Sequence, residues 1–119
     1  MRIATWNIQH GGGSRAKHIV AAVIAHDPDV IVFTEVREST RPIREDLAEA
    51  GYKHQIDQAV AKQDNGVCVV SRFSLKAQSA AAAPDRWLEV GIADAGLTLV
   101  GVHLRIERRT RHEEWQTAA

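Results

Sequence analysis

The sequence predicts a single α/β domain, built on a mixed sheet with helices on one face. Three observations support this class. A segment of strand character (2–7), an amphipathic stretch (15–26) and a continuous apolar run (30–33) follow one another at the spacing of a strand–helix–strand unit, whose two strands are parallel neighbours. In the second half, strand-like segments are separated by tight turns, as in antiparallel pairing. The length of 119 residues fits one domain, since domains cluster near ~100–150 residues.

The opening unit is delimited by residues that begin and end helices. The strand over 2–7 stops at a glycine run, and Ser14 is the expected N-cap of the helix over 15–26. Asp27-Pro28 ends that helix, because a residue that precedes proline avoids the α region. Residues 30–33 are apolar and mostly β-branched, which is typical of a strand buried on both faces.

The remaining elements follow from capping and turn signals. Thr40 and Pro42 open a second, weaker helix, which runs up to Gly51 as its C-terminal cap. Further strands are expected over 52–56, 67–71, 87–93 and 97–103. The last two strands form a hairpin with Gly96 in the left-handed conformation, and the sequence turns helical again from Glu107.

Composition excludes several classes of protein. The chain carries 15 Lys and Arg against 15 Asp and Glu, so the net charge of zero removes the simplest argument for nucleic-acid binding, an overall basic balance. Cys68 is the single cysteine, which rules out an intramolecular disulfide and a cysteine-based zinc site. No apolar run approaches the ~20 residues of a membrane helix, and residues 1–6 lack the apolar h-region that is typical of a secretory signal. We therefore expect a soluble, cytoplasmic protein with no membrane partner.

Two polar side chains follow the two parallel strands. Asn7 ends the first strand and Glu35 ends the second. Ligands of open α/β sheets bind outside the carboxyl ends of such strands, so these side chains are expected side by side at one sheet edge. An amide oxygen beside a carboxylate suits Mg²⁺ or Mn²⁺. Taken singly, Asn7 could equally cap the loop and Glu35 could be a solvated charge.

Four sequence blocks occur in a characteristic order. They are 3–8 (IATWNI), 28–36 (PDVIVFTEV), 65–72 (NGVCVVSR) and 100–104 (VGVHL). Together they resemble the N-terminal blocks of the endonuclease/exonuclease/phosphatase superfamily, which includes deoxyribonuclease I, exonuclease III-type abasic-site nucleases and inositol polyphosphate 5-phosphatases. The resemblance implies half of a four-layer α/β/β/α sandwich. It departs from the family at Thr34, where a glutamine is usual before the metal-binding glutamate.

The resemblance also implies a chemistry. Asn7 would be the active-site asparagine that binds metal-linked water or phosphate, and Glu35 the principal ligand of Mg²⁺ or Mn²⁺. His103 would contact the scissile phosphate or assist protonation of the leaving group. The implied reaction is metal-assisted hydrolysis of a phosphodiester or phosphomonoester. The partner would be a phosphoester, with DNA, RNA and phosphoinositide all open. His10, Arg86 and Arg105 are candidate phosphate contacts.

The family's second-half motifs, Gly-Asp-x-Asn and Ser-Asp-His, do not occur in this sequence. The 119 residues therefore correspond to about half of the domain resembled, and we expect a truncated domain. The alternative to an enzyme is a catalytically incomplete half-fold that acts as a binding or assembly module. In half of the fold, one sheet face built from residues such as 30–33 and 67–70 would lack a cover. Such a face predicts a two-fold dimer.

Overall fold

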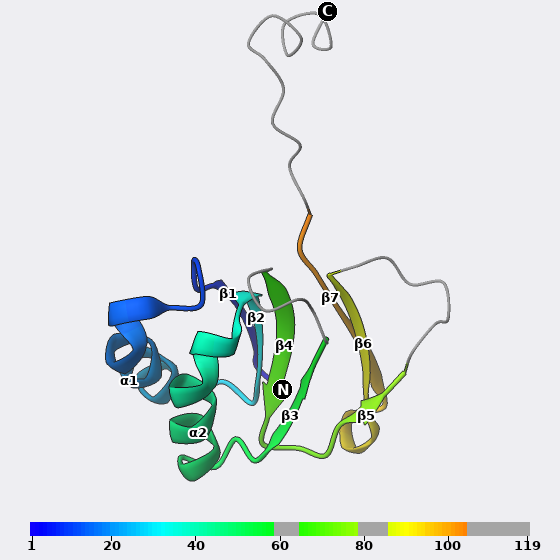
Figure 1. Ribbon diagram of the computed structural model, residues 1–119. Coiled ribbons are helices and arrows are strands. Elements are labelled where there is room, and N and C mark those ends of the chain that lie inside the picture. The colour runs from blue at the N-terminus through cyan, green and yellow to red at the C-terminus, as the bar shows by residue number, and fades with distance from the viewer. Residues whose placement is uncertain (59–64, 79–85, 105–119) are drawn as a thin grey trace, which may run out of the picture.

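The computed structural model describes residues 1–58, 65–78 and 86–104. Their elements form an α layer and two β layers (Figure 1). In chain order the helices and strands are β1 (Ile3–Asn7), α1 (Ala16–His26), β2 (Val30–Val36), α2 (Arg41–Glu49), β3 (His54–Asp57), β4 (Gly66–Ser71), β5 (Lys76–Ala77), β6 (Trp87–Ile92) and β7 (Leu97–Val102). The predicted α/β class and most of the predicted elements are confirmed. The short β5 was not predicted.

The first sheet has the order β1-β2-β4-β3 and is mixed. β1 and β2 pair in parallel with α1 between them in sequence, which confirms the predicted strand–helix–strand unit. β2 and β4 pair antiparallel, as do β4 and β3. The parallel register sets Asn7 opposite Thr34, one residue before Glu35.

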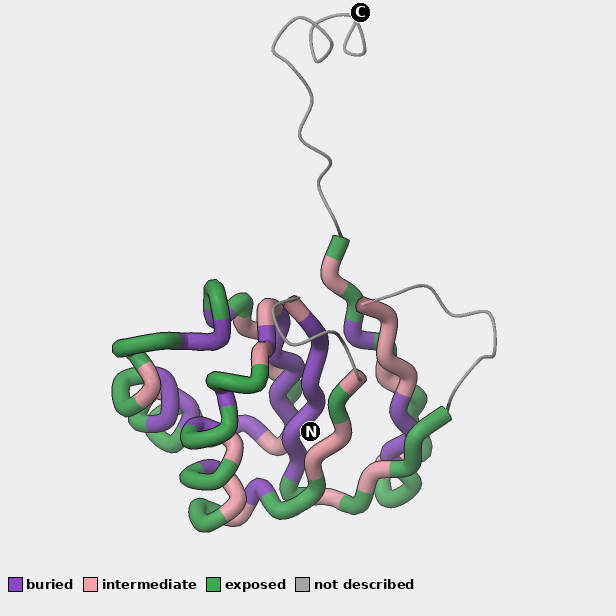
Figure 2. Tube along the Cα trace, in the orientation of Figure 1, coloured by how far each residue is buried: buried purple, intermediate pink, exposed green. Residues whose placement is uncertain are grey.

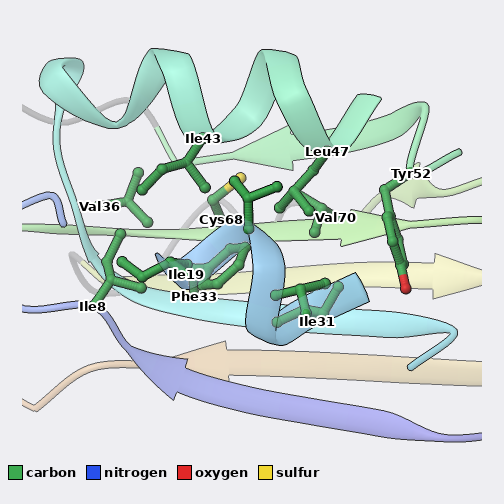
Figure 3. Packing of buried hydrophobic residues seen from close by; sticks show 12 residues of the cluster. Ile8, Ile19, Ile31, Phe33, Val36, Ile43, Leu47, Tyr52, Cys68 and Val70 are labelled. Atoms are coloured by element: carbon green, nitrogen blue, oxygen red, sulfur yellow. The ribbon is translucent and has the colours of Figure 1, made fainter. Parts of the chain in front are cut away.

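The two described helices cover one face of the first sheet (Figure 1). Figure 3 shows the core between them, in which side chains of α1 and α2 point toward β2 and β4. Its buried members are Ile8, Ile19, Val20, Val23, Ile31, Phe33, Val36, Ile43, Leu47, Tyr52, Cys68 and Val70. Burial contributes roughly 1.5–3 kcal/mol for each fully buried large apolar side chain. Burial also raises the pKa of the Cys68 thiol to about 12, so Cys68 is a neutral residue of this core.

A second sheet, of order β5-β6-β7, packs on the opposite face of the first. The facing side chains of the two sheets form a second core, made of Val30, Val32, Val67, Val69, Val90 and Ile92. Close approach of the sheets requires glycine at position 101, because a Cβ there would lie 2.8 Å from Val67 Cγ1 and 2.9 Å from Val32 Cγ1. The expectation that residues 30–33 and 67–70 leave one sheet face uncovered is therefore wrong. The hairpin of β6 and β7 folds back over that face instead of extending the first sheet.

Some local predictions hold and one does not. Asp27 ends α1 in the left-handed conformation (φ 54°), and Gly51 and Gly96 also have positive φ, as the turn signals indicated. Ser14 is not the N-cap of α1, because it lies inside a short 3₁₀ turn and Arg15 takes the capping position. The predicted C-terminal helix lies outside the described residues.

The second sheet exposes apolar side chains at the C-terminal end of β7. Val100 and Val102 on β7 are 40% and 44% exposed, and Leu104 just beyond the strand is 79% exposed. Figure 2 shows that the strands in the middle of the molecule are mostly buried, whereas the second sheet has more intermediate and exposed positions. Among the described residues, no helix combines the length and apolar character needed to cross a bilayer.

Candidate functional site

Four of the six candidate residues lie at the same end of the two-sheet sandwich, where their strands begin or end (Figure 1). Asn7 is the last residue of β1, Glu35 lies near the end of β2, and His103 follows β7. Arg86 immediately precedes β6 and so lies at the same end. The structure therefore brings together four of the six residues singled out from the sequence, on four different strand ends. Arg105 lies outside the described residues, and His10 is exposed in the loop that follows β1.

Asn7 lies on the face of β1 that is turned away from the helices. Ala4 and Trp6, at the alternating positions, pack against the helix-side core, so Asn7 belongs to the other side of the strand. The Asn7 side chain is exposed, and its Oδ1 accepts a hydrogen bond of 2.9 Å from the backbone N–H of Gln9. That bond fixes the direction of the amide oxygen and leaves a second lone pair on it for a ligand.

Glu35 occupies a β-bulge. In the β2–β4 pairing, Thr34 is opposite Val67 and Val36 is opposite Gly66, so no residue of β4 pairs with Glu35. Glu35 has φ 59°, a left-handed conformation that costs a non-glycine residue of the order of 1–3 kcal/mol.

The bulge changes which side chain faces the helices. Regular alternation after Ile31 and Phe33 would place Glu35 in the helix-side core. Instead Val36 takes that place, and Figure 3 shows its side chain near Ile43 of α2. Glu35 is left half-buried at the sheet edge, where a carboxylate can meet a ligand.

The backbone of the bulge is anchored by the glycine loop. The Gly11 N–H donates to the Glu35 carbonyl at 2.8 Å, and the Gly11 carbonyl accepts from the buried Thr40 hydroxyl at 3.1 Å. Thr40 Oγ1 in turn accepts from the backbone N–H of Arg37 at 2.9 Å. Gly11 and Gly12 are themselves buried. The loop therefore supports Glu35 through backbone contacts, which the sequence did not reveal.

Sequence reasoning missed two residues that contact the site. Asn65 Nδ2 donates to Glu35 Oε1 at 3.2 Å, and Arg37 Nε donates to Asn65 Oδ1 at 2.8 Å. Arg37 Nη2 also lies 3.0 Å from His10 Nδ1. The available signal was the β2–β4 register: because Val36 is opposite Gly66, the next pair outward is Arg37 with Asn65. That register becomes visible only once the bulge is known.

His103 has a basic partner. Arg86 Nη1 lies 3.3 Å from His103 Nδ1, and the His103 N–H donates to the Arg86 carbonyl at 3.0 Å, which continues the β6–β7 ladder by one pair. A guanidinium can only donate, so Nδ1 is the acceptor and the proton of the neutral ring is on Nε2. His103 stands two residues after the inward-facing Gly101 and therefore on the side of β7 that faces the first sheet.

The donor set fits a partly hydrated hard cation. Glu35 supplies a carboxylate whose Oε2 accepts no hydrogen bond from the described residues, and Asn7 supplies an amide oxygen. Mg²⁺ keeps several waters and is commonly held by one or two carboxylates, so two oxygen ligands suffice for partial coordination. Within 1–58, 65–78 and 86–104 there is no cluster of three or more His, Cys, Asp or Glu side chains that could form an all-protein metal cage.

Several solved structures resemble the fold of this chain. An AP endonuclease from Archaeoglobus fulgidus matches with a TM-score of 0.75 and 21% identity over 98% of this chain and 46% of its own. A 3'-5' exonuclease (NExo) from Neisseria meningitidis matches with a TM-score of 0.65 and 22% identity, covering 87% and 41% of the two chains. TDP2 from C. elegans matches with a TM-score of 0.63 and 16% identity, covering 96% and 39%.

The chain thus spans less than half of the length of these structures. No curated protein matches it. The sequence model of the Endonuclease/Exonuclease/phosphatase family matches residues 4–116. This range contains all four sequence blocks except Ile3, the first residue of the block over 3–8. The chain therefore belongs to the Endonuclease/Exonuclease/phosphatase family.

Proposed function

We propose that this chain provides the Asn7–Glu35 part of a divalent-metal-dependent phosphoester hydrolase. One observation supports this most directly: Asn7 ends β1, Glu35 is the last residue but one of the parallel neighbour β2, and a strained bulge takes the Glu35 carboxylate out of the helix-side core. A left-handed glutamate near the end of a strand is an outlier of the kind that clusters at functional sites. Membership of a family of nucleases and phosphatases agrees with this chemistry.

In this proposal Glu35 and Asn7 hold Mg²⁺ or Mn²⁺. The bound cation would neutralise charge on the phosphoryl oxygens and the leaving oxygen. The chain's own task is to present two oxygen ligands in a fixed relation. The parallel register fixes the strands, the Gln9 N–H orients the Asn7 amide, and the Gly11 N–H anchors the Glu35 backbone.

His103 is proposed as the group that donates to the phosphate or to the leaving group. Its contact with Arg86 leaves the proton on Nε2, which can therefore donate to an anionic oxygen. Arg86 and His10 are proposed as further phosphate contacts, together with Arg105. The substrate class is a phosphoester. Nucleic acid is the first candidate, since the solved structures named above include an AP endonuclease and a 3'-5' exonuclease.

The test is hydrolysis of bis-p-nitrophenyl phosphate and nicking of supercoiled plasmid with Mg²⁺ or Mn²⁺. We expect activity that EDTA abolishes and that Glu35→Gln lowers by at least about a hundredfold, because removal of one key electrostatic group costs ~10²–10³ in rate. Glu49→Gln on the exposed end of α2 is the matched control and is expected to keep full activity. Activity that survives EDTA, or that is unchanged in Glu35→Gln, would contradict the proposal.

A second candidate is an assembly module without catalysis of its own. The chain spans less than half of its structural relatives, and Val100 and Val102 expose an apolar strip on β7. In this case the partner is a second copy of the chain. Self-association together with a complete lack of metal-dependent hydrolysis would favour the module over the enzyme.

A further inference from the structure

We propose that Asn65 and Arg37 are positioning residues that hold the Glu35 carboxylate in the orientation that binds the cation. Neither residue was among the candidates from the sequence. The inference rests on the proposed function, because it concerns how the metal site is kept in place. Its basis is a continuous hydrogen-bonded chain of Glu35, Asn65, Arg37 and His10.

The direction of each hydrogen bond in this chain is fixed by chemistry. Arg37 carries donors only, so the Asn65 oxygen must face it, as the 2.8 Å contact from Nε shows. The Asn65 NH₂ group is then directed at Glu35, whose ionised carboxylate can only accept. Arg37 therefore selects the one amide orientation that supports Glu35. Reversal of the Asn65 amide would leave Arg37 facing an NH₂ group.

The interposed amide has a further consequence for the carboxylate. A direct ion pair between Arg37 and Glu35 would compete with a metal cation for the negative charge. Asn65 is neutral, so it holds Oε1 by a hydrogen bond at 3.2 Å while the carboxylate keeps its charge and Oε2 remains for the cation. Partners of this kind, which contact a ligand residue and not the metal, commonly set metal affinity.

Arg37 is itself well fixed. Its backbone N–H donates to Thr40 Oγ1 at 2.9 Å, and its guanidinium contacts both Asn65 and His10 Nδ1. The side chain is half-buried. Arg37 thus connects three segments: the end of β2, the start of β4 and the loop after β1.

Positioning and simple electrostatics predict opposite results, which makes the proposal testable. Arg37 is a cation near a cation site, so its charge alone weakens metal binding, and its removal would tighten binding. If Arg37 instead orients Glu35 through Asn65, its removal weakens binding.

The experiment is titration calorimetry of Mn²⁺ into the 119-residue chain. Asn65→Ala and Arg37→Ala are each expected to weaken binding by about tenfold or more, the usual effect of removing such a partner. Arg37→Lys keeps the charge but loses the fork that reaches both Asn65 and His10, so it is also expected to weaken binding. The double variant is expected to bind no more weakly than the worse single variant, because both substitutions break the same chain.

Arg41→Ala is the matched control, since Arg41 is exposed on α2 and pairs with Glu45. It is expected to leave Mn²⁺ affinity unchanged or slightly raised. Circular dichroism checks that each variant is folded, and Arg37→Lys replaces Arg37→Ala if the latter is not. If the parent chain binds Mn²⁺ in a Glu35-dependent way and Asn65→Ala binds equally well, the positioning role is wrong and the proposed function stands. If the parent shows no Glu35-dependent binding, both are wrong.

Discussion

At the scale of single residues, the most informative position is Glu35. Nothing in the run from Thr34 to Val36 signals a bulge, because the bulged residue is a glutamate where a glycine would be expected. The sequence could therefore predict a carboxylate near the end of this strand. It could not predict that the Glu35 side chain points away from the helix-side core. Asn65 and Arg37 were missed for a related reason, since their contact joins residues 28 positions apart and depends on the shifted register.

A left-handed conformation at Glu35 leads to a stability prediction. Glu35→Gly is expected to be more stable than Glu35→Ala by about 1 kcal/mol, because glycine adopts φ 59° without the Cβ conflict. Urea unfolding of the two variants measures the difference. Thr5 of β1 provides the control, since it is an exposed strand residue absent from the positive-φ positions. There the order should reverse, with Thr5→Gly less stable than Thr5→Ala. Equal stability of the two Glu35 variants would contradict the strain.

At the scale of elements, the glycine loop after β1 has a different role from the one its sequence suggests. A glycine-rich loop can bring backbone N–H groups to a phosphate. Here Gly11 and Gly12 are buried, and the Gly11 N–H is used by the Glu35 carbonyl. A Cβ on Gly12 would lie 2.7 Å from Ile43 Cδ1 and 3.2 Å from Ile19 Cδ1. The small residues let the loop pack onto both helices.

This packing predicts unequal costs for two neighbouring substitutions. Gly12→Ala is expected to destabilise the fold by about 1–3 kcal/mol more than Gly13→Ala, because it overpacks the core near Ile43. Gly13 is the control: it also has positive φ (50°), but a Cβ there meets nothing within 4 Å. The measurement is the free energy of unfolding in urea. Similar losses for both variants would show that φ alone, and not packing, requires glycine in the loop.

The elements themselves were largely predictable, because their signals are local. The apolar spacing of α1, the proline at its end and the glycines at φ 110° and 63° after later elements each act within a few residues. The N-cap was wrong because a 3₁₀ turn moves the start of α1 past Ser14. The two-residue β5 is too short to have a periodic signal.

At the scale of the whole molecule, the sequence could not show where the β6–β7 hairpin packs. Its alternation of apolar and polar residues fits an extension of the first sheet as well as a second layer. Gly101 permits the packing as a second layer, because its lack of a side chain lets β7 approach Val67 and Val32. Because the hairpin forms a separate layer, it covers the sheet face that was expected to drive dimer formation. The exposed apolar side chains lie instead on the outward side of β7.

The dimer therefore remains a prediction, with a new surface. β7 is an edge strand of the second sheet among the described residues, and its outward positions include Val100 and Val102. An apolar edge strand with unpaired backbone groups favours pairing with a copy of itself across a two-fold axis.

Light scattering at micromolar concentration is expected to give twice the mass of one chain. Thr replaces Val at both positions in the test variant, because it keeps β-branching while it adds polarity, and this variant is expected to be monomeric. Ile24→Thr, on the exposed face of α1, should stay dimeric. A monomeric parent, or a dimer unaffected by the β7 changes, would exclude this surface.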